Sequence, residues 1–229
     1  MIWILLLGLL LALFFLPGWW VRRVMARYHE PAERYPGTGA ELVQHLASHY
    51  GLDELKVKPV PSGTDHYDPD RRTIGLSPEN HDGRSLTAIT VAAHEMGHAI
   101  QHADGMPLFH WRQRLARVAS HAQRLGLMLI IAGPLLLLLV RVPAAMFWSL
   151  AAGLSLMLLV TLVHLITLPV ELDASFRRAL PILERGEYLY PDDRPHARRI
   201  LSAAAWTYVA QSLGALLNLG VWARILRPF

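Results

Sequence analysis

Two histidines and a glutamate with the spacing of a hydrolytic metal site occur in the run His94-Glu95-Met96-Gly97-His98. Residues four apart lie on one face of an α-helix, so His94 and His98 can bind one metal ion together. Glu95 follows one step around the helix, where its carboxylate can take a proton from a metal-bound water without binding the ion. The spacing therefore predicts a zinc site with Glu95 as general base. The alternative is a helix that carries two structural histidines.

A catalytic zinc ion with two histidine ligands normally takes one further carboxylate and leaves its fourth position to water. The chain has no cysteine, so its ligands must be His, Asp or Glu. Glu171 and Asp173 are the nearby choices, and they lie about 200° apart around a helix, so only one should face the motif helix. We favour Glu171, because His164, Ser175 and Arg178 share its helix face. The alternative is that Glu171 is a solvated carboxylate at the membrane surface.

The helix that must position the two histidines is predicted to span residues 86–103. Ser85 is a suitable N-cap residue, and the pair Asp104-Gly105 ends the apolar pattern. The uncharged run before His94 is far shorter than the roughly 20 residues that a membrane helix needs. The motif helix therefore belongs to a polar domain, which distinguishes it from the metal-binding helix of an intramembrane protease.

The chain before the motif helix is predicted to form a helix and a small sheet. A capping box at Thr38 begins a helix that Gly51 ends. Alternating residues predict one strand at 55–60 and another around 73–76. Because an edge strand can pair with an extended peptide, residues 72–77 are predicted to bind substrate in this way. A purely structural hairpin is the alternative.

Four blocks without charged residues have roughly the length of a membrane helix. The first has no basic residue before it and no cleavage site after it, which predicts a retained anchor and not a signal peptide. Of the 22 Lys and Arg residues, 19 lie within 22–124 and 177–199, and the positive-inside rule places both regions in the cytoplasm. The basic balance thus reflects topology and the lipid bilayer, and nucleic acid is not an expected partner. The blocks are residues 3–20, 125–140, 142–170 and 200–223.

These patterns predict a mainly α integral membrane protein with about four transmembrane helices and a cytoplasmic α+β zincin-like domain. The predicted divisions are an N-terminal transmembrane anchor at 1–21, the zincin-like domain at 22–124 with its motif helix at 86–103, transmembrane helices at 125–141, 142–169 and 200–223, a cytoplasmic segment with the third ligand at 170–199, and a tail at 224–229. The site should therefore combine the soluble domain with the transmembrane bundle.

Several motifs together resemble the YugP-type bacterial membrane zinc metallopeptidases, and the likeness covers nearly the whole chain. More distantly, the chain is similar to the HtpX-type and CAAX-prenyl-protease-type gluzincins, in which the Glu of a Glu-x-x-Ala-Asp motif is the third ligand. Residues 171–175 match that motif except that Ser175 replaces the final Asp, and the match supports Glu171 as ligand. The motifs are His-Glu-Met-Gly-His-Ala-Ile-Gln at 94–101, Thr-Asp-His-Tyr-Asp-Pro at 64–69, Leu-Ser-Pro-Glu at 76–79, Leu-Pro-Val-Glu-Leu-Asp-Ala-Ser at 168–175, and Ala-Ala-Ala-Trp-Thr-Tyr-Val-Ala at 203–210.

The resemblance implies peptide-bond hydrolysis with one Zn²⁺ at the cytoplasmic face of a bacterial inner membrane. Polypeptides or membrane-protein segments are the implied substrates. In this mechanism Glu95 takes a proton from a zinc-bound water, whose pKa is lowered to about 7, and passes it to the leaving amine. The sequence does not predict the oligomeric state.

Further side chains are candidates for supporting roles. Ser175 or Asp173 is expected to orient the ligand histidines. His164 is either a packing residue within its span or a contact of Glu171 or substrate. His102, one turn beyond the motif, is expected at the surface or behind the ligands. The candidates to stabilise the oxyanion are Arg178, Tyr208 and His66.

A noncatalytic membrane scaffold that binds zinc is the competing function. It predicts zinc binding without hydrolysis. Zinc transport is disfavoured, because the apolar blocks contain no Asp or Glu and His164 is their one histidine.

Overall fold

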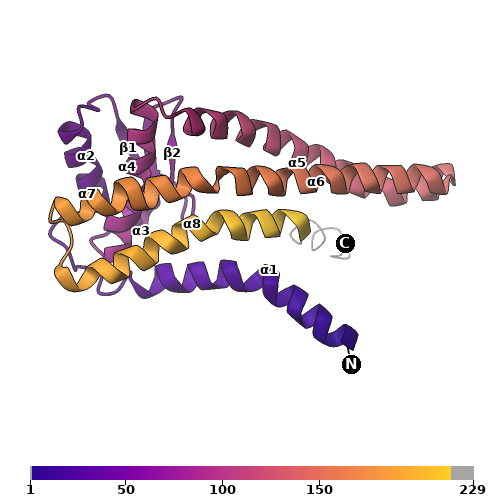
Figure 1. Ribbon diagram of the computed structural model, residues 1–229, viewed down its shortest axis with the longest axis horizontal. Helices are drawn as coiled ribbons and strands as arrows, with labels where there is room; N and C mark the ends of the chain where they lie inside the picture. The colour runs from indigo at the N-terminus through magenta and orange to yellow at the C-terminus, as the bar shows by residue number, and fades with distance from the viewer. Residues whose placement is uncertain (1, 218–229) are drawn as a thin grey trace. The chain divides into compact units, whose positions relative to one another are not determined.

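The computed structural model describes residues 2–217, with side chains described for residue 12 and for 15–206. The protein is mostly helical and has one small sheet (Figure 1). Its chain divides into two compact units. The first, called here the helix-pair unit, is built on Trp111–Leu168, and the second, the mixed unit, is built from Leu16–His110 and Pro169–Thr207.

The elements follow one another in a simple order. The first half of the chain forms α1 (Ile2–Arg27), α2 (Gly39–His49), β1 (Lys56–Pro59), β2 (His66–Asp68), β3 (Thr73–Leu76), α3 (Pro78–His81) and α4 (Leu86–Ala103). The second half forms α5 (Pro107–Val140), α6 (Pro143–Leu172), a π-helix (Asp173–Ala179), α7 (Leu180–Arg185), a short 3₁₀-helix (Pro191–Asp193) and α8 (Arg194–Leu217).

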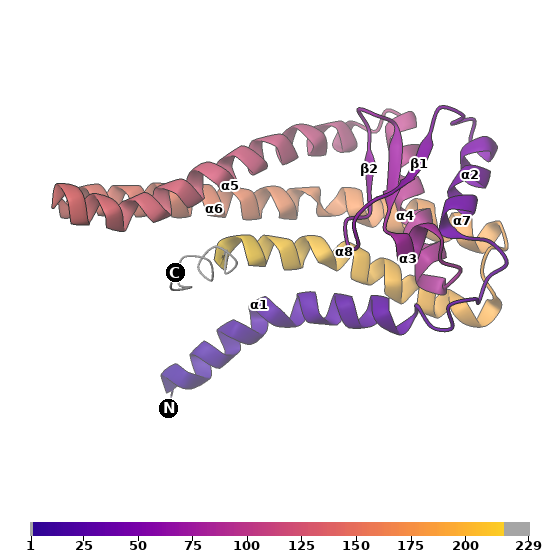
Figure 2. The same ribbon diagram turned by 180° about the vertical axis from the view of Figure 1, so that it is seen from behind.

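Helix α4 lies at the centre of the mixed unit. Ser85 caps it by accepting a hydrogen bond from the backbone N–H of Ala88 at 3.1 Å, and every residue from Leu86 to Gln101 is buried. Helices α2 and α3, strands β2 and β3 and the π-helix all pack against it (Figures 1 and 2). The bounds of α4 are those predicted for the motif helix, and the metal-binding motif therefore lies inside the core.

The sheet corrects one prediction about the substrate strand. Its strand order is β1-β3-β2, with β1 parallel and β2 antiparallel to β3. Strand β3 is thus central and fully buried, so the prediction that residues 72–77 form an edge strand is wrong. The prediction failed because strand β2 pairs with β3, and β2 has only three residues, too few to show an alternating pattern in the sequence. The two edges of the sheet are β1 and β2.

The predicted start of α2 is confirmed. The side chain of Thr38 accepts a hydrogen bond from the backbone N–H of Glu41, and the Glu41 carboxylate accepts one from the backbone N–H of Thr38. The helix ends at His49, and Gly51 follows with a φ of 65°, which favours glycine. The buried face of α2 then packs against α4.

The helix-pair unit contains α5 and α6, which run side by side in both views (Figures 1 and 2). The hydroxyl of Ser149 on α6 donates a hydrogen bond to the carbonyl oxygen of Leu129 on α5 at 2.6 Å. A Cβ atom on Gly153 would lie only 2.7 Å from the carbonyl oxygen of Gly126. Small residues therefore lie where the two helices meet, and they allow the helices to pack closely.

Two helices among the described residues are long and apolar enough to cross a membrane. They are Pro107–Val140 and Pro143–Arg185, the second of which continues α6 through the π-helix and α7. Their most apolar windows have mean hydropathies of 2.0 and 2.2, and only 17% and 33% of those windows are buried. A core helix of a soluble protein would be mostly covered, so the exposed apolar surface fits a lipid environment.

Helix α6 contains Pro169 and continues through it to Leu172. Two of the predicted spans are described only in part. The predicted span at 3–20 coincides with part of α1, whose first turns lack described side chains. The predicted span at 200–223 extends beyond the described residues. Both spans stay predictions.

Candidate metal centre

Three buried side chains from two distant parts of the chain converge in the mixed unit. His94 and His98 come from α4, and Glu171 comes from the last turn of α6. One ligand atom from each lies within 4.8 Å of those of the other two. The Glu171 Oε2 atom is 3.5 Å from Nε2 of His94 and 3.2 Å from Nε2 of His98. The exposed fractions of the three residues are 6%, 3% and 0%.

Gly97 allows the segment that carries Glu171 to approach α4. A Cβ atom at position 97 would lie 2.7 Å from the carbonyl oxygen of Ala174, which is closer than real Cβ contacts come. The backbone of the π-helix therefore packs directly on α4 between the two histidines. Sequence reasoning did not identify this role, although a glycine within a buried helix is a signal of close backbone approach.

Each histidine is held by a hydrogen bond at its other ring nitrogen. The Nδ1 atom of His94 is 3.1 Å from the Ser175 hydroxyl, and Nδ1 of His98 is 2.9 Å from Oε1 of Gln101. In both rings this leaves Nε2 to face Glu171. In metal sites, a hydrogen bond at the ring nitrogen that does not bind the metal fixes the orientation and the tautomer of the imidazole. Ser175 was predicted to orient a histidine, whereas Gln101, three residues after His98, was missed.

Asp173 also reaches α4, which corrects the prediction that only one of the two carboxylates can do so. The side chain of Gln101 donates from Nε2 to Oδ2 of Asp173 at 2.9 Å and to the carbonyl oxygen of Val170 at 2.8 Å. The long side chain of Gln101 spans the distance, and the helix changes from α to π at Asp173. The simple angle of 100° per residue therefore does not describe this segment.

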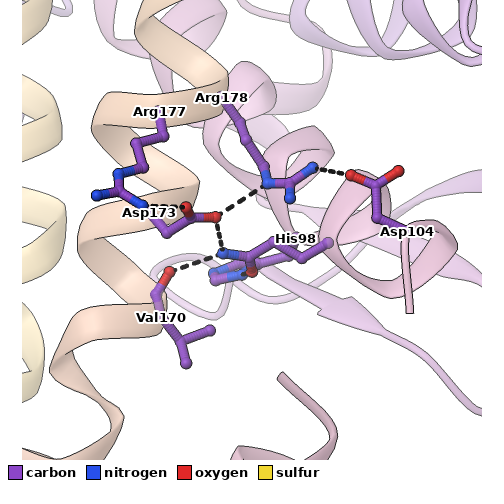
Figure 3. A network of polar contacts seen from close by, with 7 residues as sticks. His98, Asp104, Val170, Asp173, Arg177 and Arg178 are labelled. Carbon is purple, nitrogen blue, oxygen red and sulfur yellow. Dashed lines mark hydrogen bonds and ion pairs between the residues drawn. The ribbon is translucent and has the colours of Figure 1, made fainter. Parts of the chain in front are cut away.

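The predicted oxyanion donors differ in what they contact. Arg178 donates to Oδ2 of Asp173 at 3.0 Å and to Oδ2 of Asp104 at 2.5 Å (Figure 3). His66 is exposed on β2, and its Nδ1 donates to the carbonyl oxygen of Thr64 at 2.7 Å. The side chain of Tyr208 lies outside the described residues. The assignment of an oxyanion donor therefore stays a prediction.

His164 lies on α6 within the helix-pair unit, whereas all three potential ligands lie in the mixed unit. Its role stays a prediction. The boundary between the units falls at Leu168, so Glu171 belongs with the motif helix.

A polar pair that sequence reasoning missed lies one turn beyond the motif. The hydroxyl of Tyr67 on β2 is hydrogen-bonded to Nδ1 of His102, with a distance of 2.8 Å between the two atoms. Burial raises the pKa of Tyr67 to about 12, so its hydroxyl keeps the proton at neutral pH. Burial also lowers the pKa of His102, and the nearby charges of His110 and Arg72 lower it further. The pair connects an edge strand of the sheet to the metal-motif helix.

The donor set fits zinc. Two neutral imidazole nitrogens and one carboxylate are the ligands of hydrolytic zinc sites that keep one position for water. Thiolates cannot contribute, because the chain has no cysteine. Glu95 follows His94 on the same helix and is itself buried, with 7% of its surface exposed. The site therefore combines potential ligands for zinc with an adjacent carboxylate that can act as a base.

Comparison with known proteins defines the class of this protein. The family described as "putative neutral zinc metallopeptidase" matches residues 2–227, so the chain belongs to that family. One relative of the chain is the "putative membrane protease YugP" of Bacillus subtilis (strain 168). It is 36% identical over 183 residues, which cover 80% of this chain and 77% of the relative. No solved structure matches the chain. The resemblance inferred from the sequence motifs is thereby confirmed.

Proposed function

We propose that the protein is a membrane-embedded, zinc-dependent endopeptidase that hydrolyses peptide bonds at the cytoplasmic membrane surface. The observation that carries this proposal is the convergence of His94, His98 and Glu171 in a chain of a zinc metallopeptidase family. All three side chains are buried, and hydrogen bonds at Nδ1 leave Nε2 of each histidine facing Glu171.

The proposed chemistry divides the work among neighbouring side chains. His94, His98 and Glu171 would hold one zinc ion, which supplies Lewis acidity and a water with a pKa lowered to about 7. Glu95 accepts the proton from that water on its carboxylate and then delivers it to the nitrogen of the leaving amine. Burial of these residues limits competing bulk water and strengthens the electrostatic interactions among them.

The proposed location rests on the apolar helices and on charge. Helices α5 and α6 cross the inner membrane of a bacterium, and the blocks at 3–20 and 200–223 add two further spans. The basic stretches 22–124 and 177–199 then lie in the cytoplasm. Glu171 follows directly on the apolar block of α6, so the site lies at the bilayer surface and favours membrane-protein segments as substrates.

The full division of the chain is proposed on the same grounds. It comprises an anchor at 1–21, a zincin-like domain at 22–124, transmembrane helices at 125–141, 142–169 and 200–223, a cytoplasmic segment with the third ligand at 170–199, and a tail at 224–229.

The decisive test of this function is cleavage by the purified full-length protein in detergent or lipid vesicles. An unfolded polypeptide or membrane-protein substrate should be cut, and a chelator should stop the reaction until zinc is restored. Glu95→Gln should bind zinc normally but cleave at least about 100-fold more slowly, because it cannot accept the proton. Glu187→Gln, an exposed carboxylate on another loop, is the matched control and should retain full activity.

Two outcomes would contradict the proposal. Equal turnover by Glu95→Gln and the unaltered protein would exclude Glu95 as the base. Tight zinc binding with no cleavage of any substrate would favour the noncatalytic zinc-binding scaffold instead.

A further inference from the structure

The protonation of the His98 ring can be derived from its neighbours. Gln101 donates from Nε2 to two acceptors, the carbonyl oxygen of Val170 and a carboxylate oxygen of Asp173. Its amide orientation is fixed by these contacts, so Oε1 must be the atom that faces His98. An amide oxygen only accepts, and Nδ1 of His98 must therefore carry the proton. The lone pair of Nε2 is then directed towards Glu171.

The contacts of Gln101 continue outwards through two ion pairs. Asp173 accepts from Nε of Arg178 at 3.0 Å, and another nitrogen of the same guanidinium donates to Asp104 at 2.5 Å. Asp104 caps the C-terminus of α4. His98, Gln101 and Asp104 occur at intervals of three on one helix. The contacts that lead from Gln101 through Asp173 and Arg178 to Asp104, called here the network, therefore join α4 to the π-helix at two places (Figure 3).

The network extends from the core to the surface. Gln101 is fully buried, the side chains of Asp173 and Arg178 are 13% and 19% exposed, and that of Asp104 is 58% exposed. The side chain of Arg177, the neighbour of Arg178, is 84% exposed, and its guanidinium comes no closer than 3.9 Å to the carboxylate of Asp173. Two adjacent arginines therefore differ in their contacts, since only Arg178 bridges the two carboxylates.

The π-helix makes the contact between Asp173 and Arg178 in this network possible. Asp173 and Arg178 are five residues apart, which on an α-helix would separate them by about 140° around the axis. In a π-helix each backbone N–H donates to the carbonyl oxygen five residues earlier, as the N–H of Leu180 donates to the carbonyl oxygen of Ser175. Residues five apart then lie one turn apart on the same side. An ordinary α-helix would separate Arg178 from Asp173.

We propose that Gln101, Asp173, Arg178 and Asp104 form a positioning network that fixes the Nδ1–H tautomer of His98. The network also ties the end of α4 to the segment that carries Glu171, so metal affinity depends on an ion pair that reaches the surface. This inference rests on the proposed metal site. The four residues act through His98 and do not themselves bind metal or substrate.

The test measures zinc affinity by competition with a chelator on the full-length protein. Gln101→Met keeps the side-chain volume but removes both hydrogen-bonding ends, and should weaken zinc binding about 10- to 100-fold. Arg178→Gln acts one contact further away and should weaken it by about two- to tenfold. Arg177→Gln is the matched control and should change the affinity less than about twofold, because exposed ion pairs contribute little.

A double variant separates positioning from general damage. If Gln101 and Arg178 act through the same network, the double variant Gln101→Met with Arg178→Gln should bind zinc no more weakly than Gln101→Met alone. Gln101→Met should also alter the visible spectrum of the cobalt-substituted protein, which reports the geometry of the ligands. Thermal unfolding of the metal-free variants shows that each one is folded.

The outcomes distinguish this inference from the proposed function. If the unaltered protein binds zinc tightly but Gln101→Met and Arg178→Gln bind it equally well, or if their effects simply add, the network is refuted and the metal site stands. If the unaltered protein does not bind zinc, both proposals fail. A weaker affinity with non-additive effects and an altered cobalt spectrum is the expected result.

Discussion

Helix α4 and the pair α5 and α6 differ in what covers their apolar residues. Every residue of α4 from Leu86 to Gln101 is buried by protein, although this stretch includes two histidines, a glutamate and a glutamine. In contrast, only 17% of the most apolar window of α5 and 33% of that of α6 are buried. Large side chains such as Leu139 and Trp148 are 77% and 70% exposed. One region thus encloses polar chemistry, and the other presents apolar surface outwards.

The contrast shows two uses of apolar residues, which form a protein core around α4 and an exposed surface on α5 and α6. In α4 the apolar residues form a core in which the polar donors gain hydrogen-bonding partners from the π-helix. In α5 and α6 the polar groups at the helix contact are few, and one hydroxyl bonds to a carbonyl oxygen of the neighbouring helix. The two regions should therefore respond differently to the same kind of substitution.

The largest expected effect is the loss of the third ligand. Glu171→Gln keeps the shape of the side chain but removes the negative charge, so zinc affinity should fall by well over about 100-fold, more than the loss of an outer contact costs. Zinc content after dialysis and chelator competition measure the change. Asp192→Gln, a carboxylate exposed in the 3₁₀-helix, is the control and should retain zinc. Full retention of zinc by Glu171→Gln would exclude this ligand.

A charge on the exposed face of α5 should instead reduce membrane insertion and leave zinc affinity unchanged. Leu138 is 72% exposed, and Leu138→Asp places a charge in the apolar block at a cost of about 2.5–3.5 kcal/mol if the site is at the bilayer centre. The fraction of protein recovered in membranes should fall, while the molecules that do insert keep their zinc affinity. Unchanged membrane insertion would argue against a lipid-facing position for Leu138.

Alanine substitutions at Gly97 on α4 and at Gly133 on α5 compare the packing of the two regions. Gly97→Ala would direct its Cβ at a backbone carbonyl 2.7 Å away, and such overpacking should cost about 1–3 kcal/mol and weaken zinc binding. At Gly133 on α5 the nearest atoms belong to the flexible side chain of Leu150, at 3.1 Å. Gly133→Ala should therefore be tolerated, helped by the roughly 1 kcal/mol by which Ala favours a helix over Gly. Thermal unfolding should separate the two variants, and equal melting temperatures would contradict the difference in packing.

The smallest expected effect is a pH dependence at the start of α4. Nδ1 of His29 lies 3.1 Å from the hydroxyl of the N-cap residue Ser85. Burial lowers the pKa of His29 below its usual 6.5, although the charges of Glu79, Asp65 and Glu30 oppose the shift. The unfolded chain therefore binds the proton more readily, and stability should be complete above about pH 6.5 and decrease as the pH falls through the folded pKa.

His29→Gln removes the titrating group and should flatten this part of the profile. Melting temperatures between about pH 5 and pH 7.5 measure the effect. The exposed His49, substituted in the same way, is the control and should leave the slope unchanged. An identical slope in the protein and in His29→Gln would exclude His29 as the cause.

The sequence allowed prediction of the local features of the site better than its distant contacts. The i, i+4 spacing of His94 and His98 predicts their common face, and the bounds of α4 follow from Ser85 and from the end of the apolar pattern. The contact with Glu171 spans more than 70 residues and was suggested only by ligand chemistry and by family resemblance. Periodicity alone does not predict which distant segments meet.

Other features depend on geometry that has no simple sequence pattern. The π-helix breaks the angular rule that separated Glu171 from Asp173, and the three residues of β2 are too few to reveal a strand. Gln101 resembles any polar residue on a helix until Val170 and Asp173 are placed beside it. Each of these cases results from tertiary packing that overrides local regularity.

A metal-bound structure with anomalous scattering at the zinc edge tests the central claim most directly. We predict one zinc ion within about 2.2 Å of Nε2 of His94, Nε2 of His98 and a carboxylate oxygen of Glu171, with Glu95 not bound to the metal. A zinc ion bound elsewhere, or bound to the two histidines without Glu171, would contradict the account.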